Sequence, residues 1–516
     1  LQGKNIPIIG GRYGLSSKEF TPTMVLAVYK HLHKGGFHGF TVGIEDDVSK
    51  LSLPLDEVIN TVPGGTISCK FWGLGSDGTV GANKNSIKII GDHTDMNVQG
   101  YFQYDSKKSG GITRSHLRFG KKPIHSQYLV YTEDFVACHN QAFIGRFDLL
   151  SGIKENGVFL LNSNWEMNDV FNHLTCDMQE TIINRKIKFY NIDGLKIAEE
   201  VGLGGRVNTV MQTAFFLISG VMDRTEAISL IKESIRKTYE RKGEDVVQMN
   251  LNAVDKVNEA LVEVHIPNAV PDKCTPRKQL VPAGSTGFVQ EVIEPIMREQ
   301  GDVITVSQMP LDGYVESGTA KLEKRRVAPA VPKWISENCI QCNQCSLVCP
   351  HAVIRPVLTD ASDGAPESFI SKPAVGKELA GLNFRIQISP LDCTGCGNCI
   401  ETCPAKEKAL KFTPLTKAAG EQEANWAFAS SLKQKDVAVN VKSVKGSQFL
   451  QPLFEFSGAC AGCGETPYIK LVTQLYGDRM IIANATGCTS IYGGSAPTCP
   501  YTTNDKGHGP AWANSL

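Results

Sequence analysis

The chain has 516 residues and no formal net charge, with 41% hydrophobic and 21% charged residues. This length can form about three to five domains with sizeable cores. The balanced charge gives no electrostatic attraction to nucleic acid or to a membrane surface. The most apolar helix-like run, 213–222, is far too short to cross a bilayer. No signal or transit peptide is visible.

Residues 1–55 predict the end of an α/β domain followed by a linker. Residues 6–14 resemble a strand end and a glycine turn, and a helix is predicted over 22–33. Thr21 is a suitable N-cap for this helix, and Pro22 suits its first position. The segment begins within an element and without Met, so we expect the chain to be a piece of a longer polypeptide.

Residues 56–270 alternate between strand-like and helix-like segments. The predicted strands are 66–72, 86–90, 126–130, 158–161 and 187–192. A helix is predicted behind Asp223 and Glu226, which have the spacing of a capping box. Such alternation predicts a parallel sheet covered by helices.

A glycine-rich loop follows the first of these strands. Gly73, Gly75 and Gly78 form a G-x-G-x-x-G pattern just before a helix. Backbone N–H groups there can approach a phosphate, although a tight turn also needs glycine. Residues 107–111 and 202–206 add further cations and glycines, or are only a solvated turn and a helix entry. Together these features predict a nucleotide-like anionic ligand.

Residues 271–330 are rich in proline and predict a connector that carries one small unit. The unit ends on the charged run 321–326, which we interpret as a solvated face.

Residues 331–415 contain two copies of the motif C-x2-C-x2-C-x3-C-P. This spacing is typical of ferredoxins that bind two 4Fe–4S clusters, and the fourth cysteine of each copy binds the other cluster. The first cluster is assigned Cys339, Cys342, Cys345 and Cys403, and the second Cys393, Cys396, Cys399 and Cys349. Disulfides suit small secreted domains, and zinc ribbons need only paired C-x2-C units. We expect an inserted hairpin or loop over 354–389.

Residues 416–450 predict a linker and an exposed helix, and a second group of cysteines follows. Cys460 and Cys463 precede a predicted helix start, and Cys488 follows a predicted strand over 479–485. Three thiolates are too few for a cubane, so either a fourth lies elsewhere or the metal differs. Cys499 is a candidate for the fourth by proximity.

The other isolated cysteines and histidines are interpreted as structural. Buried structural use also suits Cys499. The residues concerned are Cys69, Cys138, Cys176 and Cys274, with His93, His116 and His139. The clustered cysteines, by contrast, indicate a reducing compartment.

Several of these motifs occur together, in the same order, in one known family. They lie at residues 10–18, 73–84, 115–120, 323–325, 339–404 and 457–467. With them the chain resembles pyruvate:ferredoxin (flavodoxin) oxidoreductase over essentially its whole length. The resemblance implies oxidative decarboxylation of pyruvate with coenzyme A, giving acetyl-CoA and carbon dioxide. Electrons would pass through three 4Fe–4S clusters to ferredoxin or flavodoxin.

The resemblance also implies a fold and a domain order. The fold is α/β and multidomain, with an inserted α+β ferredoxin-like domain. The order is an upstream α/β end (1–55), a coenzyme A-binding domain (56–270), a linker with a small EKR-type domain (271–330), the two-cluster ferredoxin domain (331–415) and the start of a thiamine-diphosphate-binding domain (416–516).

Individual residues take roles from the same resemblance. Cys460, Cys463 and Cys488 would hold the cluster nearest thiamine, with a fourth cysteine beyond residue 516 in place of Cys499. Glu465 and Cys488 would touch thiamine diphosphate. The phosphates of coenzyme A would meet Gly75, Ser76, Asp77, Gly78 and Thr79, with further contacts from Lys107, Asn208 and Asn250.

The sequence departs from the family in two places. The Gly-Asp-Gly…Asn segment that binds Mg²⁺ and diphosphate is absent, as is the domain that holds the thiamine pyrimidine and the pyruvate carboxylate. The main catalytic residues are therefore expected outside this chain, which should be inactive alone. The family also implies a homodimer of the full enzyme, in the cytoplasm or, in a eukaryote, the hydrogenosome. The alternatives are the oxidoreductase of another 2-oxo acid and a stand-alone iron–sulfur electron-transfer protein.

Overall fold

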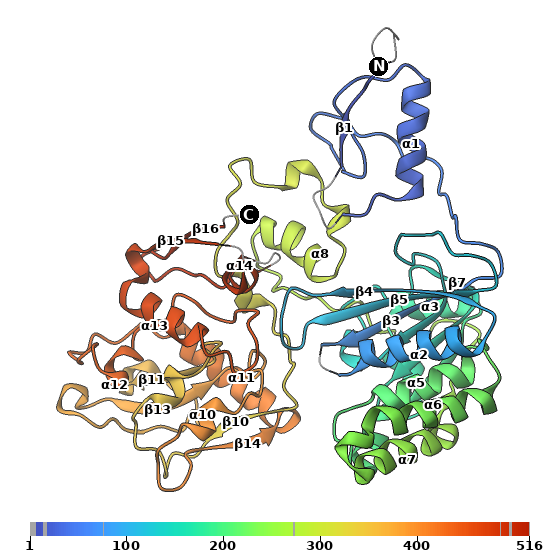
Figure 1. The fold of residues 1–516 in the computed structure, drawn as a ribbon. Helices are drawn as coiled ribbons and strands as arrows, with labels where there is room; N and C mark the ends of the chain where they lie inside the picture. Colours follow the sequence, from blue (N-terminus) through green and yellow to red (C-terminus); the bar gives the residue numbers. More distant parts are fainter. Residues whose placement is uncertain are drawn as a thin grey trace. The chain divides into compact units, whose positions relative to one another are not determined.

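The computed structural model describes residues 7–13, 18–75, 77–271, 274–485, 487–494 and 498–514. The chain divides into two compact units (Figure 1). The first unit comprises Leu1–Asp105, Ile112–Gln279 and Arg298–Leu311, and the second comprises Ser106–Gly111, Leu280–Met297 and Asp312–Leu516.

The first unit begins with a small helical element. Helix α1, Pro22–His33, starts at Thr21, whose hydroxyl accepts a hydrogen bond from Met24 N at 3.4 Å. This confirms the predicted helix and its cap. Strand β1, Gly11–Arg12, pairs in parallel with β2, Phe40–Thr41.

A seven-stranded sheet forms the body of the first unit. In spatial order its strands are β4 Asn97–Tyr104, β5 Ile112–Gly120, β3 Ile67–Leu74, β6 Glu133–Cys138, β7 Ile153–Asn162, β8 Lys188–Ile192 and β9 Val262–Glu263. Strands β3, β6, β7 and β8 run parallel, whereas β4, β5 and β9 pair antiparallel. The sheet is therefore mixed, with the predicted parallel arrangement at its centre.

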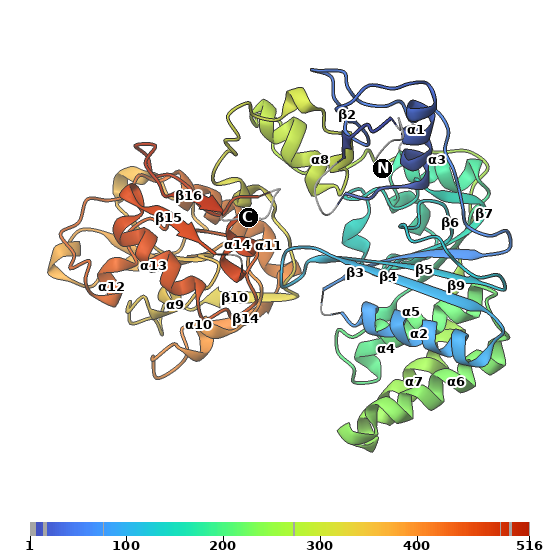
Figure 2. The same ribbon diagram turned by 45° about the horizontal axis from the view of Figure 1, so that its top comes forward.

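Helices cover both faces of this sheet. They are α2 Thr79–His93, α3 Cys176–Asn184, α4 Gly194–Glu200, α5 Asn208–Ile218, α6 Arg224–Tyr239 and α7 Glu244–Ala260. Neighbouring strand residues point to opposite faces: Phe71 packs in a core with α2, α5, α6 and α7, and Trp72 packs in a second core that includes α3. Figure 2 shows the α2, α5, α6 and α7 layer along one face.

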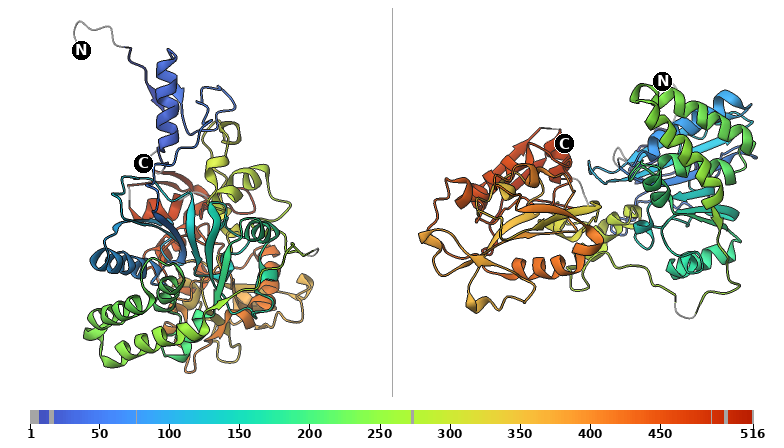
Figure 3. Two further views of the ribbon diagram at one scale, coloured as in Figure 1. Left: turned by 90° about the vertical axis from the view of Figure 1, so that its right-hand side faces the viewer. Right: turned by 90° about the horizontal axis from the view of Figure 1, so that it is seen from below.

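Helix α6 confirms the helix predicted from its cap. The Asp223 carboxylate accepts hydrogen bonds from Thr225 N at 2.9 Å and Glu226 N at 3.0 Å. Ile231 and Ile235 then bury one face of the helix against the core. Figure 3 shows α6 and α7, in green, side by side.

Two of the predicted strands are wrong. Residues 86–90 lie inside α2, where Ala82, Ser86 and Ile90 are buried at helical spacing. Residues 126–130 form no strand, because their carbonyls serve another group: the buried Arg118 guanidinium donates to Ser126 O, Tyr128 O and Leu129 O.

Two of the isolated cysteines of the first unit are buried as thiols, and two others form a disulfide. Cys69 and Cys138 are fully buried, as predicted. Cys176 and Cys274, interpreted as isolated, instead form a disulfide across a separation of 98 residues. The adjacent Thr175 and Thr275 pair as a parallel bridge and so bring the two Cα atoms to 5.2 Å, within disulfide range.

The second unit is built around the two cysteine motifs. Strand β10, Ala330–Trp334, pairs antiparallel with β14, Leu410–Pro414. The predicted insertion is a three-stranded antiparallel sheet with β13 at its centre. Its strands are β11 Ile354–Thr359, β12 Lys372–Pro373 and β13 Asn383–Ile388. The short helices within the two motifs are α9 Gln344–Leu347 and α10 Asn398–Glu401.

Helix α11, Leu415–Ser431, confirms the predicted helix, and residues 432–443 form neither helix nor strand, as expected of the predicted linker. The helix is buried only at Ala418, Gln422 and Asn425 and is otherwise exposed or half-buried. Its buried face packs against β13, where Gln387 Nε2 donates to Gln422 Oε1 at 3.0 Å.

The remaining elements of the second unit are short. They are α8 Glu294–Met297, α12 Val444–Ser447, α13 Thr466–Tyr476, β15 Ile481–Asn484, α14 Cys488–Gly494 and β16 Ala511–Asn514. Strands β15 and β16 pair in parallel, which confirms the strand predicted within 479–485. Within the described residues no helix is long and apolar enough to span a bilayer.

The buried imidazole of His116 predicts acid sensitivity of the first unit. Its Nδ1 accepts from Val130 N at 3.2 Å, and its Nε2 lies 2.9 Å from Gln103 Oε1, so the neutral ring donates through Nε2. Burial, then the neighbouring charges of Lys70, Arg114 and Arg118, lower its pKa from 6.5 to about 2. Only the unfolded state therefore binds the extra proton between these values, and stability falls as the pH drops through this window.

Hydrogen exchange of the β5 amides, corrected for intrinsic exchange rates, measures this loss. The opening free energy should fall between pH 7 and pH 4 in the wild type, and His116→Gln should weaken that dependence. Equal slopes in the two proteins would assign the acid sensitivity to other groups.

Candidate functional site

The glycine loop between β3 and α2 is held by a carboxylate. Asp77 accepts hydrogen bonds from Leu74 N at 2.8 Å and Thr79 N at 2.7 Å. Gly78 follows with φ +88°, a conformation that glycine adopts without strain. Gly75 is half-buried and Gly78 exposed, whereas Ser76 lies outside the described residues. The loop thus presents backbone at the start of a 15-residue helix.

Two neighbours fix the position of this loop. A Cβ at Gly78 would lie 2.8 Å from Asn208 Cγ, so the first turn of α5 packs directly against the glycine. Thr79 Oγ1 lies 2.7 Å from Nδ1 of the buried His139. Burial lowers the pKa of His139 to about 4, against the opposing effect of the Asp77 carboxylate. The histidine is a neutral core residue, as predicted.

The other predicted coenzyme A contacts occupy different environments. Asn250 is buried, and its amide accepts from Thr209 Oγ1 at 2.8 Å and donates to Val246 O at 2.9 Å. Lys107 belongs to the second unit, where its amino group forms an ion pair with Glu323 at 2.8 Å. The structure therefore brings Asn208 to the glycine loop. Asn250, in α7, instead contacts Thr209 of α5.

One polar residue at this edge of the sheet was not predicted from the sequence. Asn162, at the end of β7, donates to His139 O at 2.9 Å and accepts from Gly194 N at 2.9 Å. It therefore links the carboxyl ends of β6, β7 and β8, the edge where open α/β sheets bind ligands. In the sequence, Asn162 could have been found as a polar residue that directly follows an apolar strand.

The eight motif cysteines line two separate cavities. The first is lined by Cys339, Cys342, Cys345 and Cys403, and the second by Cys349, Cys393, Cys396 and Cys399. Each cavity therefore takes three cysteines from one motif and the fourth from the other, which is the predicted grouping. Four thiolates are the donor set of a 4Fe–4S cluster, so these residues fit that group.

The backbone around each cavity is bent in the same way. Gln341 and Asn343 have φ 59° and 60°, and the matching Gly395 and Gly397 have φ 69° and 83°. This bend turns Gln341 N towards Cys339 Sγ and Gly395 N towards Cys393 Sγ, each at 3.4 Å. Such hydrogen bonds to cysteine sulfur influence cluster reduction potentials.

The two motifs stabilise this bend by different means. Glycine adopts it freely in the second motif. In the first, the Gln341 side chain donates to Pro373 O at 2.9 Å and accepts from Val375 N at 2.8 Å. The inserted segment around β12 therefore holds the first cavity in shape.

The thiols that line the two cavities include groups with a raised pKa. Burial raises the pKa of Cys345, and the neighbouring Cys339 and Cys342 raise it further. Burial likewise raises the pKa of Cys393 to about 12. Converging thiols in such sites ionise only when metal neutralises their charge.

The loop that carries Cys460 and Cys463 lies beside the second cavity. A Cβ at Gly462, between Cys460 and Cys463, would lie 3.8 Å from Cys396 Cβ. His351, which lines the second cavity, makes a hydrogen bond of 3.0 Å through Nδ1 to Ser457 O. Cys460 and Cys488 are exposed, and Cys463 is half-buried.

Cys499 packs against the same small core as Cys463. Glu465 is exposed at the N-cap of α13, and burial together with its carboxylate raises the pKa of Tyr492. Cys499 is bound through its backbone, since its N–H donates to Thr319 Oγ1 at 2.8 Å and its carbonyl accepts from Ala320 N. This contact agrees with a structural role for Cys499.

The charged run 321–326 is solvated only at its ends. Lys321 and Arg326 are exposed, as predicted. Glu323 is 6% exposed and paired with Lys107, and Lys324 pairs at 2.5 Å with the buried Asp392. Arg325 donates to Ser109 O. The interpretation as a solvated face is therefore wrong for these three residues, because their partners come from distant segments of the chain.

Three family models match the chain. A model described as pyruvate ferredoxin/flavodoxin oxidoreductase matches residues 68–260, and a 4Fe-4S dicluster domain matches 338–407. A domain of unknown function, EKR, matches 275–328.

Curated relatives match the whole chain. It is 60% identical to pyruvate:ferredoxin oxidoreductase of Moorella thermoacetica over 100% of its length, and 50% identical to pyruvate-flavodoxin oxidoreductase of Enterobacter agglomerans over 99%. It is also 50% identical over 99% to a protein of Euglena gracilis named mitochondrial pyruvate dehydrogenase [NADP(+)].

The chain spans 44% of the first two relatives and 28% of the Euglena protein. The resemblance to the pyruvate:ferredoxin (flavodoxin) oxidoreductase family that the motifs predicted is therefore confirmed along the whole chain.

Proposed function

We propose that this chain supplies the coenzyme A site and the electron exit of a pyruvate:ferredoxin oxidoreductase. The observation that carries the proposal is the arrangement of three cysteine groups in the second unit. Two four-cysteine cavities adjoin, and the loop with Cys460 and Cys463 packs on the second of them. Such a series suits a reaction whose two electrons leave one at a time.

In this proposal the two cavities and the third group hold 4Fe–4S clusters. When bound, the clusters supply one-electron carriers of low potential. The cysteines orient them, and the surrounding apolar residues exclude water. The third group would need a fourth thiolate that the described residues do not provide. This series supports a full oxidoreductase over a stand-alone electron-transfer protein, as does the similarity along the whole chain.

The glycine loop of the first unit is the proposed coenzyme A site. Gly75, Ser76, Asp77, Gly78 and Thr79 would meet its phosphates through backbone N–H groups at the start of α2. Asn208 lies against the loop and would complete this site. Asn250 would support this site through its hydrogen bond with Thr209 of α5. A contact from Lys107 would have to compete with its ion pair to Glu323.

The last segment is the proposed start of a thiamine-diphosphate-binding domain. Glu465 at the start of α13 and Cys488 at the start of α14 would face the cofactor. The parallel pairing of β15 and β16 supports an α/β domain here. The residues that bind Mg²⁺ and the pyruvate carboxylate would lie outside this chain.

The proposed partners follow from the names of the relatives. Ferredoxin or flavodoxin would accept the electrons, as in the bacterial relatives, whereas the Euglena relative is named for NADP. A homodimer of the full enzyme, in a reducing compartment such as the cytoplasm or hydrogenosome, completes the proposal.

Coenzyme A should raise the melting temperature of the protein, because a ligand that binds only the native state stabilises it. Gly78→Ala should remove this shift, since the new Cβ would lie 2.8 Å from Asn208 Cγ at a positive φ. Gly81→Ala is the matched control: it lies two residues into the same helix and its Cβ would meet nothing within 4 Å. Differential scanning fluorimetry with and without coenzyme A measures both.

Equal shifts in the two variants would refute the loop assignment. If Gly78→Ala does not fold, Asn208→Ala tests the same site from the α5 side, again by comparison with Gly81→Ala.

Cluster ligands should cross between the motifs. Cys403→Ala should remove the same EPR signal as Cys342→Ala, and Cys349→Ala should remove the same signal as Cys396→Ala, because each pair lines one cavity. Spectra of dithionite-reduced protein, purified without oxygen, give the comparison. If Cys403→Ala and Cys396→Ala abolished the same signal, the crossing would be wrong.

A further inference from the structure

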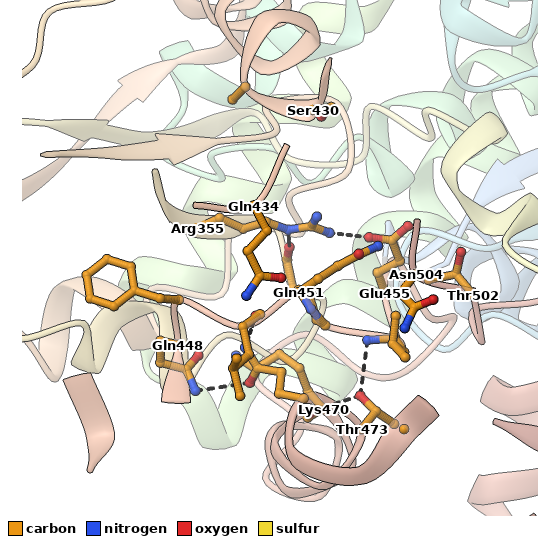
Figure 4. Close-up of a pocket in the computed structure, with 18 of the residues that line it drawn as sticks. Arg355, Ser430, Gln434, Gln448, Gln451, Glu455, Lys470, Thr473, Thr502 and Asn504 are labelled. Atoms are coloured by element: carbon orange, nitrogen blue, oxygen red, sulfur yellow. Dashed lines mark hydrogen bonds and ion pairs between the residues drawn. The ribbon is translucent and has the colours of Figure 1, made fainter. Parts of the chain in front are cut away.

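A lysine from outside the ferredoxin motifs reaches the peptide that joins the two cluster sites. Lys470, in α13, is 2% exposed. Its amino group donates to Ser346 O and, at 3.1 Å, to Leu347 O. Figure 4 shows Lys470 on its helix, near the ion pair of Arg355 and Glu455.

This amino group contacts the stretch of chain that runs from one cluster site to the other. Ser346 and Leu347 lie between Cys345, a ligand of the first site, and Cys349, a ligand of the second. Burial lowers the pKa of Lys470 to about 8, and the charges of Cys349 and Cys345 act in the opposite direction. Within the described part of the chain no carboxylate forms an ion pair with it.

A buried ammonium without a carboxylate partner needs negative charge nearby. Two carbonyl oxygens satisfy part of its hydrogen-bonding capacity but carry only partial charge. The thiolates on either side, with the clusters that they would hold, supply a full negative charge. Lys470 is thus placed where the charge of both clusters acts on it.

Two further lysines contact the first site only. Lys372, in β12, donates to Ser336 O and Cys339 O, each at 2.7 Å. Lys408 donates to Glu401 O at 2.8 Å and Cys403 O at 2.9 Å.

Beside the second site two cations have acidic partners, whereas Arg325, whose charge acts on the cavity residue His351, donates to the Ser109 carbonyl. Lys324 pairs with Asp392, next to Cys393, and Arg355, which donates to Ala352 O, pairs with Glu455. Such pairs have little net charge, so their effect on a nearby cluster is small compared with that of an unpaired ammonium.

We propose that Lys470 is a positioning residue that makes both ferredoxin-type clusters easier to reduce, while Lys372 and Lys408 favour reduction of the first cluster further. The proposal rests on the clusters of the proposed function. With the clusters bound, each of these positive charges would stabilise an added electron; no bond would change and no proton would move.

The physical basis is the Coulomb interaction between a fixed charge and one added electron. Inside a protein this interaction is screened much less than at the surface. Removing a buried ammonium should therefore lower the potential of every cluster close to it, whereas removing an exposed one should have little effect.

Redox titration followed by EPR tests the proposal on the full chain, with dithionite as reductant and clusters loaded without oxygen. Lys470→Met should lower both ferredoxin-type midpoints, each by at least a tenfold change in the reduction equilibrium, or 59 mV for one electron. Lys372→Met should lower only one. Lys411→Met, which removes an exposed charge from the same module, should change neither.

Several outcomes would overturn the proposal. Two unchanged midpoints in Lys470→Met, with iron content equal to wild type, would show that its charge is unimportant. A shift of only one midpoint would place it at a single cluster. If Lys470→Met does not hold clusters, Lys470→Gln is titrated in its place, because its amide still donates but carries no charge. Wild-type protein without iron would instead refute the proposed function.

Discussion

The convergence of thiolates is the constraint on which the second unit depends. Burial raises the pKa of Cys345 and the neighbouring cysteines raise it further, so four thiols in one cavity would all become thiolates only with metal to balance their charge. Because Cys349 and Cys403 each line the cavity of the opposite motif, neither site can form before both motifs have folded together. The β10–β14 pairing and the β11–β13 sheet then hold the crossed arrangement.

The segment around the third cysteine group depends on contacts from distant parts of the chain. Lys108 N donates to Gly458 O at 2.9 Å, and Ala461 N donates to Ser109 Oγ at 2.7 Å. Residues 106–111, which connect β4 and β5, therefore belong to the second unit rather than to the sheet that they leave. With the Lys107–Glu323 ion pair, they fix the loop that carries Cys460 and Cys463.

Local sequence signals predicted local structure well. The cysteine spacing predicted which cysteines line each cavity, and Thr21 and Asp223 predicted two helix starts, because each signal acts within a few residues. Contacts between distant residues were not predictable in this way. The run 86–90 is apolar and suits either a strand or a helix until the cap at Gly78 is seen. The disulfide depends on a bridge between Thr175 and Thr275.

For the candidate site as well, local features were predictable and contacts between distant residues were not. The glycine loop was visible in the sequence, but Asn162 and the contact between Asn208 and Gly78 depend on the order of strands in the sheet. A single lysine on an amphipathic helix normally faces solvent. Only the packing of α13 shows that Lys470 points inward, to the peptide between Cys345 and Cys349.

Native mass spectrometry of the protein, purified without oxygen, weighs the bound metal and sulfide and so shows whether the motif cysteines hold clusters. The mass should exceed that of the polypeptide by two intact 4Fe–4S clusters, and this increment should remain when Cys499 is replaced by alanine. Bound zinc, or a mass lowered by disulfide formation among the eight motif cysteines, would contradict this prediction.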